Sequence, residues 1–154
     1  MKFSVNGKES GDVITTTNGQ PVDWKIEAFS PNAVEKVEII VNGKVAWSGT
    51  GFTGKQTFAG KINAPNGGWI AARIYGGATK PPFTDSYPFA HSAPLWFNKI
   101  GSSDAASAKN SAQDLLRWMD VAEKRMNQAY EGGAVENLRK RFADARKILE
   151  AKAK

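Results

Sequence analysis

The spacing of apolar residues changes near Gly101, from every second residue before it to every third or fourth residue after it. A period of two is typical of half-buried β-strands, and a period of 3.6 is typical of amphipathic helices. The chain therefore predicts a strand-forming part over residues 1–101 and a helical part over residues 102–154. Its 154 residues suit one domain, or one compact domain with an appendage, and its 41% hydrophobic content allows a sizeable core.

The strand-forming part predicts an immunoglobulin-like antiparallel β-sandwich. Asn42 and Gly43 readily take the positive φ angles of a two-residue type I′ turn, so residues 37–41 and 44–47 are expected to form a β-hairpin. Residues 22–28 alternate apolar with charged side chains, as a half-buried strand does. Further strands are predicted at residues 3–5, 13–16, 56–62, 69–75 and 95–97, with an irregular loop over residues 76–88. Seven or so short strands separated by Gly, Pro and Asn are typical of such a sandwich.

The helical part predicts a two-helix hairpin. The first helix is expected to begin at Asn110 or Ser111 and to end at Gly132 and Gly133, and the second to begin near Val135. The predicted apolar stripes are Leu115, Met119, Ala122, Met126 and Tyr130 in the first helix, and Leu138, Phe142, Ala145 and Leu149 in the second. Because two isolated helices are only marginally stable, we expect them to pack on each other and on the sandwich as one unit.

The residue types restrict the chemistry that this chain can perform. It has one histidine, His91, and no cysteine, so it lacks the residues for thiol catalysis and for a multi-ligand zinc site. Asp85, His91 and Ser92 could suggest a nucleophilic triad, but neighbours on a strand point to opposite faces, so His91 could not easily activate Ser92. We therefore expect no catalytic residues, no metal ligands and no cofactor, and the chain alone is not expected to be an enzyme.

A glycine-rich segment imitates two nucleotide-binding motifs. Gly49, Gly51 and Gly54 match G-x-G-x-x-G, and Gly49, Gly54 and Lys55 match most of a phosphate loop. A phosphate loop needs a hydroxyl residue after its lysine and a helix to follow, whereas Gln56 follows here and the next residues alternate as in a strand. The segment is therefore expected to be a hairpin loop.

The net charge of +6 is spread along the chain. There are 10 basic and 7 acidic residues through Gly101, and 11 and 8 after it. Interspersed charges, such as Glu35, Lys36 and Glu38, indicate a solvated surface, and no nucleic-acid partner is expected. The same interpretation applies to the basic surface predicted on the second helix, which comprises Arg139, Lys140, Arg141, Arg146 and Lys147.

No membrane segment is expected, since no apolar run approaches the ~20 residues that a spanning helix needs. Residues 1–11 contain no apolar stretch of a signal peptide, and the compartment is left open.

Four tryptophans fall on predicted strands: Trp24, Trp47, Trp69 and Trp96. Exposed aromatic rings can stack on sugars or on nucleic-acid bases, but aromatic residues on strands usually fill a core. At least two of the four are expected to be buried.

Five segments together resemble the C-terminal region of CehA/McbA-type metallohydrolases, which are carbaryl-hydrolase-like proteins related to polymerase-and-histidinol-phosphatase (PHP) domains. The segments are FSVNGKESGDVI at residues 3–14, VEIIVNGKVAWSG at 37–49, WIAARIYG at 69–76, FAHSAPLWF at 89–97 and SAQDLLRWMD at 111–120. The most specific parts are the strand that ends at Arg73 and the group Ala90, His91 and Pro94. The chain departs from the family pattern at Ser92 and Ala93, where threonine and serine are usual, and at residues 95–97, where an aliphatic-tyrosine-valine strand is more usual.

The resemblance implies a non-catalytic C-terminal accessory domain that supports or caps an upstream catalytic domain, which holds the metal ligands. The expected partner is that hydrolase domain, in cis or in trans. Arg73 is expected to pair with a carboxylate or with backbone carbonyls near residues 89–97. His91 and Ser92 are expected to face the catalytic domain or its substrate cleft, because a proline-rich loop leads into their segment. The alternative is a free-standing β-sandwich module that binds carbohydrate or protein through exposed tryptophans.

Overall fold

The computed structural model describes residues 1–78, 81, 88–130 and 133–154. The chain divides into two compact units, Met1–Asp104 and Ala105–Lys154. The first unit is built of strands and the second of two helices, as the change of period predicts. Most of the predicted irregular loop at residues 76–88 lies outside the described residues.

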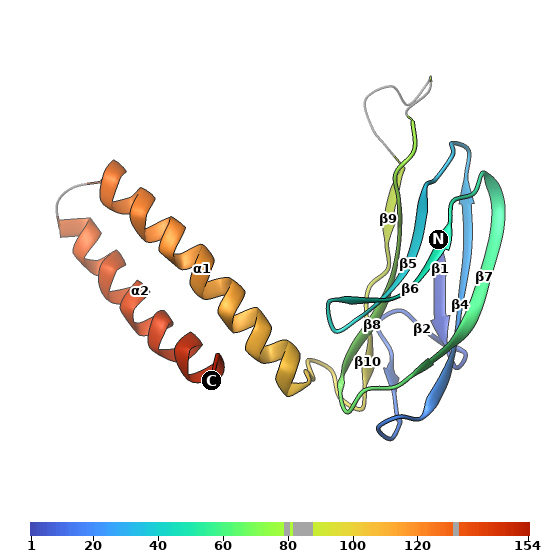
Figure 1. Cartoon of the computed structure of the whole chain (residues 1–154), viewed down its shortest axis with the longest axis horizontal. Helices are drawn as coiled ribbons and strands as arrows, with labels where there is room; N and C mark the ends of the chain where they lie inside the picture. The colour runs from blue at the N-terminus through green and yellow to red at the C-terminus, as the bar shows by residue number, and fades with distance from the viewer. Residues whose placement is uncertain (79–80, 82–87, 131–132) are drawn as a thin grey trace. The chain divides into compact units, whose positions relative to one another are not determined.

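The first unit contains two sheets of mostly antiparallel strands, which form two layers in Figure 1. One sheet has the order β2-β1-β4-β7, and the other has the order β3-β10-β8-β5-β6, with β9 also paired to β8. We call them the four-stranded and the six-stranded sheet. The strands are β1 (Lys2–Val5), β2 (Lys8–Glu9), β3 (Val13–Ile14), β4 (Pro21–Ser30), β5 (Lys36–Val41), β6 (Lys44–Thr50), β7 (Gly54–Asn63), β8 (Gly68–Tyr75), β9 (Phe89–His91) and β10 (Leu95–Phe97).

The predicted hairpin is confirmed. β5 and β6 pair antiparallel, and between them Asn42 and Gly43 have φ angles of 50° and 82°. β4 alternates exposed and buried side chains over its whole length, as its sequence predicts. The short strands β2 and β9 were not among the predicted ranges.

The core of the first unit lies between the two sheets. It contains Phe3, Trp24 and Ile26 from the four-stranded sheet and Ile39 and Ile70 from the six-stranded sheet, among others. Trp24 is 2% exposed, and its ring centroid lies 4.7 Å from that of Trp47. Phe58 continues this group, with its ring 5.9 Å from Trp47. Trp24 is therefore buried in the core, and the partly buried Trp47 packs against the core.

Polar contacts attach the residues after β10 to two turns of the sheets. The Ser102 hydroxyl accepts a hydrogen bond from the Gly68 backbone N–H (2.9 Å) and donates one to the Phe97 carbonyl (2.8 Å). The Asn42 side chain donates to the Asp104 carboxylate (2.6 Å) and accepts from the Trp69 backbone N–H (2.8 Å). These bonds explain why the strand unit continues to Asp104, whereas the change of period lies at Gly101.

β7 is an edge strand of the four-stranded sheet, and β6 is an edge strand of the six-stranded sheet. The pairing between β5 and β6 shifts register between Ile39 and Ile40, which is a β-bulge or a similar irregularity. β7 has ten residues, and Lys55 and Lys61 lie on its exposed side. These two edges are therefore irregular or charged.

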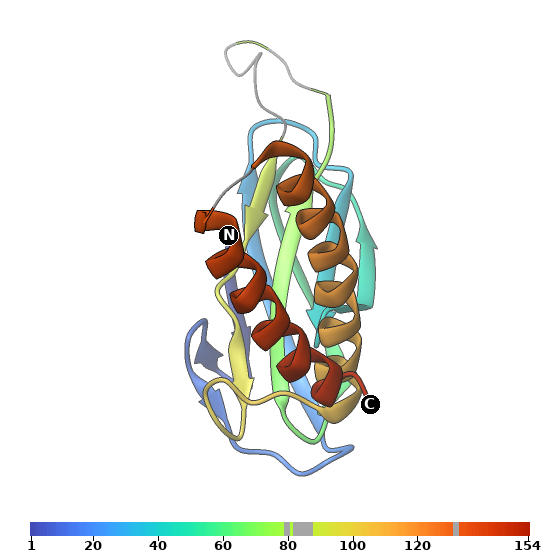
Figure 2. The ribbon, with the colours of Figure 1, turned by 90° about the vertical axis from the view of Figure 1, so that its left-hand side faces the viewer.

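The second unit contains α1 (Ala105–Ala129) and α2 (Gly133–Lys152), which pack side by side in Figures 1 and 2. α1 begins at Ala105, before the predicted start at Asn110 or Ser111. Its first turns contain three alanines, which favour helix strongly but carry no apolar stripe. Asp104, directly before, is a residue type that favours the N-cap position. Gly133 begins α2 instead of ending α1. Neither helix is long and apolar enough to cross a membrane.

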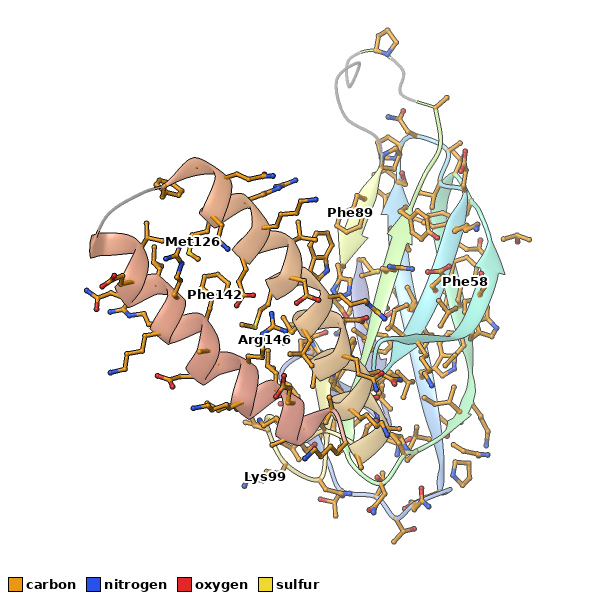
Figure 3. The ribbon with its side chains drawn as sticks, turned by 60° about the vertical axis from the view of Figure 1, so that its left-hand side comes forward. Phe58, Phe89, Lys99, Met126, Phe142 and Arg146 are labelled. Carbon is orange, nitrogen blue, oxygen red and sulfur yellow. The ribbon has the colours of Figure 1, made fainter. Side chains whose placement is uncertain are left out.

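The predicted stripes are correct in part. Met119, Met126, Phe142 and Leu149 are buried or half-buried, and Figure 3 shows Met126 and Phe142 between the helices. The stripes were wrong at Leu115, Ala122, Tyr130, Leu138 and Ala145, which are exposed. The physical reason is that a pair of helices covers a narrower strip of each helix than a larger core does.

Two arginine side chains of α2 form hydrogen bonds with residues of α1. The Arg146 guanidinium bonds to Asp120 (2.7 Å) and Glu123 (2.9 Å), and these bonds raise its pKa above the ordinary arginine value. The Arg139 guanidinium bonds to Asn127 (3.0 Å). Arg146 lies between the helices in Figure 3. The predicted solvated basic surface is therefore wrong for Arg146, which is half-buried.

We predict that Gly60→Ala destabilises the first unit by about 1–3 kcal/mol, because overpacking a well-packed core costs this much. A Cβ at Gly60 would lie 2.8 Å from Cζ2 of Trp24, which is closer than real side chains pack. Thermal and urea unfolding would measure the loss. Thr57→Ala, at an exposed position of the same strand, is the matched control. Equal stability of the two variants would show that the Trp24 ring can move aside.

Candidate functional site

The outer face of the six-stranded sheet carries the residues singled out from the sequence. On β8 the side chains of Ile70, Ala72 and Ile74 enter the core, so those of Trp69, Ala71 and Arg73 lie on the opposite, outer face. His91 is the register partner of Arg73, and Trp96 is the register partner of Trp69. The pairing of β9 and β10 with β8 therefore brings Arg73, His91 and the two remaining strand tryptophans onto one face.

A small hollow lies on this face, and we call it the tryptophan hollow. Its volume is about 140 Å³, and it is lined by Trp69, Ala71, His91, Pro94 and Trp96. Both indoles are half-buried, whereas Ala71 is 0% exposed. The volume corresponds to about four or five water molecules at ~30 Å³ each. The hollow therefore suits one apolar side chain better than an extended ligand.

His91 and Ser92 have different surroundings. The His91 ring is exposed, and its Nδ1 lies 2.6 Å from the Ser92 carbonyl oxygen. The Ser92 hydroxyl accepts a hydrogen bond from the Ala72 N–H (3.0 Å), and the Ser92 N–H donates to the Ala72 carbonyl (2.9 Å). Ser92 thus extends the pairing of β8 beyond β9. The docking role predicted for both residues stays a prediction, and only His91 lines the hollow.

Arg73 pairs with a carboxylate, as one of the two expectations states, and that carboxylate belongs to Glu38. The Arg73 Nε–H donates to Glu38 Oε2 (2.7 Å), and the Tyr75 hydroxyl donates to Glu38 Oε1 (3.1 Å). The guanidinium carbon also lies 5.1 Å from the centre of the Tyr75 ring. Glu38 is only 5% exposed, so the sequence interpretation of Glu38 as a solvated charge was wrong.

The outer face of the four-stranded sheet is charged. Lys2, Lys25 and Lys61 there form ion pairs with Glu9, Glu27 and Asp23. The hydrogen bond with Glu9 raises the pKa of Lys2, and the hydrogen bond with Lys25 lowers the pKa of Glu27. Two wide depressions of about 600 and 510 Å³ lie among these residues. Solvated ion pairs of this kind contribute little to stability and do not define a ligand.

The glycine-rich segment does not form a phosphate loop. Gly54 begins the strand β7, and no helix follows that could direct its N-terminus at a phosphate. Gly49 lies against the Trp47 ring, where a side chain would not fit. The expected loop is present, but it is not a hairpin, because β6 and β7 belong to different sheets.

Within the described ranges, which omit Asp85, no group of three His, Asp or Glu side chains is placed to hold a metal ion. The triad considered from the sequence therefore involves a residue outside the described part of the chain.

Two features of this face were missed by sequence reasoning. Ala71 and Pro94 complete the hollow, but alanine carries no chemical signal, and Pro94 was singled out only for the family resemblance and not as part of a pocket. The partnership of Glu38 with Arg73 joins residues 35 positions apart, and only the register of β5 with β8 reveals it.

Comparisons with protein-family models, with curated proteins and with solved structures give no match to this chain. The resemblance to CehA/McbA-type hydrolases therefore remains an expectation that rests on the five quoted segments.

We predict that Arg73→Ala destabilises the first unit by about 1–3 kcal/mol, because it leaves the buried Glu38 carboxylate without its cation. Breaking a fully buried ion pair usually costs about 3–5 kcal/mol. A smaller loss of stability is expected here, because solvent reaches the Arg73 side chain, which is 38% exposed. Arg73→Lys should lose less, because it keeps the charge.

A double-mutant cycle with Glu38→Gln checks the cause of the loss. In the Glu38→Gln background, Arg73→Ala should cost less than about 1 kcal/mol, since no buried charge is left unpaired. An unchanged cost in that background would mean that Arg73 acts through its packing on Tyr75.

Proposed function

We propose that this chain is a non-catalytic accessory domain of a metal-dependent hydrolase of the CehA/McbA type, and that it docks on the catalytic domain through the outer face of the six-stranded sheet. The observation that carries the proposal is the tryptophan hollow. Its lining side chains are apolar except for the His91 imidazole and the two indole N–H groups. Paired tryptophans around a small pocket are typical of anchoring points in protein interfaces.

The proposal includes an immunoglobulin-like topology for the first unit. If β1, β4 and β7 correspond to strands A, B and E, one sheet has the order A-B-E. If β5, β6, β8 and β10 correspond to C, C′, F and G, the other sheet has the order G-F-C-C′. The parallel pairing of β3 with β10 then places β3 beside strand G. This order supports the topology.

The second candidate is a free-standing module that binds carbohydrate, and the half-buried Trp69 and Trp96 favour it. A sugar needs aromatic rings to stack on and polar groups that bond to its hydroxyls. Among the side chains lining the hollow, only His91 and the two indole N–H groups can form such bonds, and only His91 can accept one. The hollow therefore favours an apolar side chain of a protein over a sugar.

The test is a calorimetric titration of this chain with a CehA/McbA-type catalytic domain supplied in trans. We expect binding that Trp96→Ala and Trp69→Ala each weaken about tenfold or more, since central interface tryptophans commonly contribute this much. His91→Ala should weaken it less. Phe29→Ala is the matched control, because Phe29 is 63% exposed on the four-stranded sheet.

Binding that is unaffected by the hollow variants would contradict the docking surface. If oligosaccharides bind instead and quench tryptophan fluorescence in a Trp96-dependent way, the chain is the carbohydrate-binding module.

We also predict that the purified chain hydrolyses no ester, amide or phosphoester at enzymatic rates and retains no stoichiometric zinc or manganese, because its single histidine cannot form a catalytic ligand cluster. Elemental analysis and substrate assays would check this. Bound metal together with turnover that His91→Ala abolishes would overturn the non-catalytic assignment.

A further inference from the structure

One side of α1 carries an apolar pair that α2 does not cover. Trp118 is 70% exposed and Val121 is 42% exposed. Residues turn by about 100° each around a helix, so these two lie on a different side of α1 from Ala112, Met119 and Met126, which are buried or half-buried. The contacts within the helical pair therefore leave this side unused.

Charged residues of opposite sign flank the pair. Asp114 lies one turn before Trp118, and Arg125 lies one turn after Val121. The four residues occupy positions i, i+4, i+7 and i+11, which form one continuous stripe on a helix. We call Asp114, Trp118, Val121 and Arg125 the back stripe of α1.

The back stripe is complementary to itself. When two copies of α1 meet antiparallel about a two-fold axis near residues 119 and 120, Trp118 of one copy lies opposite Val121 of the other. Asp114 then lies opposite Arg125, and the symmetry repeats both pairings at the other end. A two-fold interface requires such a match of apolar and charged positions.

The existing contacts of the two charges allow this match. Asp114 Oδ1 pairs with Arg117 on the same helix, and the second carboxylate oxygen can accept from another guanidinium. In the described part of the chain, no ion pair involves Arg125. Pairing with a second copy would therefore satisfy Arg125 without breaking an ion pair.

We propose that the back stripe is a self-association surface through which two copies of this chain form an antiparallel α1–α1 dimer. The contact is one helix wide, so it belongs to the small, weak class of interfaces, and the dimer forms at micromolar or higher concentration. The back stripe belongs to the helical unit and the tryptophan hollow to the strand unit, and the proposed dimer does not depend on the proposed function.

Sedimentation equilibrium of the full chain over a range of concentrations tests the dimer. Trp118→Ala should weaken dimerisation about tenfold or more, because it removes the main apolar contact. Ile148→Ala is the matched control, since Ile148 is 60% exposed on α2 and lies outside the stripe. A chain that stays monomeric at all concentrations overturns the proposal. A lower melting temperature of Trp118→Ala would then show only that Trp118 stabilises the fold of the monomer.

Charge reversal tests the antiparallel register. Asp114→Arg and Arg125→Asp should each weaken the dimer about threefold to tenfold, since each brings like charges together at both ends. The double variant restores opposite charges and should recover most of the affinity. Lys140→Asp on α2 controls for the change of net charge, and far-ultraviolet circular dichroism shows whether α1 stays helical. A double variant as weak as the singles overturns this pairing.

Discussion

The strand unit depends on how two indole rings are accommodated between its sheets. Trp24 and Trp47 lie with ring centroids 4.7 Å apart, one from each sheet. Packed sheets are separated by only about 10 Å, so two large rings fit only where their neighbours are small. Gly60 and Gly49 provide this room beside Trp24 and Trp47. A side chain at either glycine would collide with the neighbouring indole, so the two glycines leave the space that the rings occupy within their own sheets.

Local patterns predicted the strands well, because alternation and the Asn42-Gly43 pair act over a few residues. They failed where a distant partner decides. Glu38 looks solvated beside Lys36, yet Arg73 and Tyr75 keep its carboxylate buried. Trp69 and Trp96 each look like core residues, and only the register of β8 with β10 brings them together on the outer face. In the helices, the period was correct but the buried strip is narrower, so Leu115 was wrongly assigned to it.

The two sheets present chemically different outer faces. The four-stranded sheet exposes lysines paired with carboxylates, which water solvates well. The six-stranded sheet holds the ion pair of Arg73 with the buried Glu38 beside an apolar hollow. Since both faces are made of alternating strands, the difference lies in the side chains and not in the backbone. A partner could distinguish the two faces by desolvation alone.

The irregular pairing of β5 with β6 also affects how copies of this chain can aggregate. A regular, flat edge strand offers its free backbone groups to another chain, and repeated addition of this kind builds amyloid fibrils. The shifted register at Ile39 and Ile40 interrupts the regular pairing of β6, and Lys55 and Lys61 place charge along β7. Growth of a continuous cross-β sheet is therefore opposed at the β6 and β7 edges, so copies of this chain are not expected to add strand by strand along either of them.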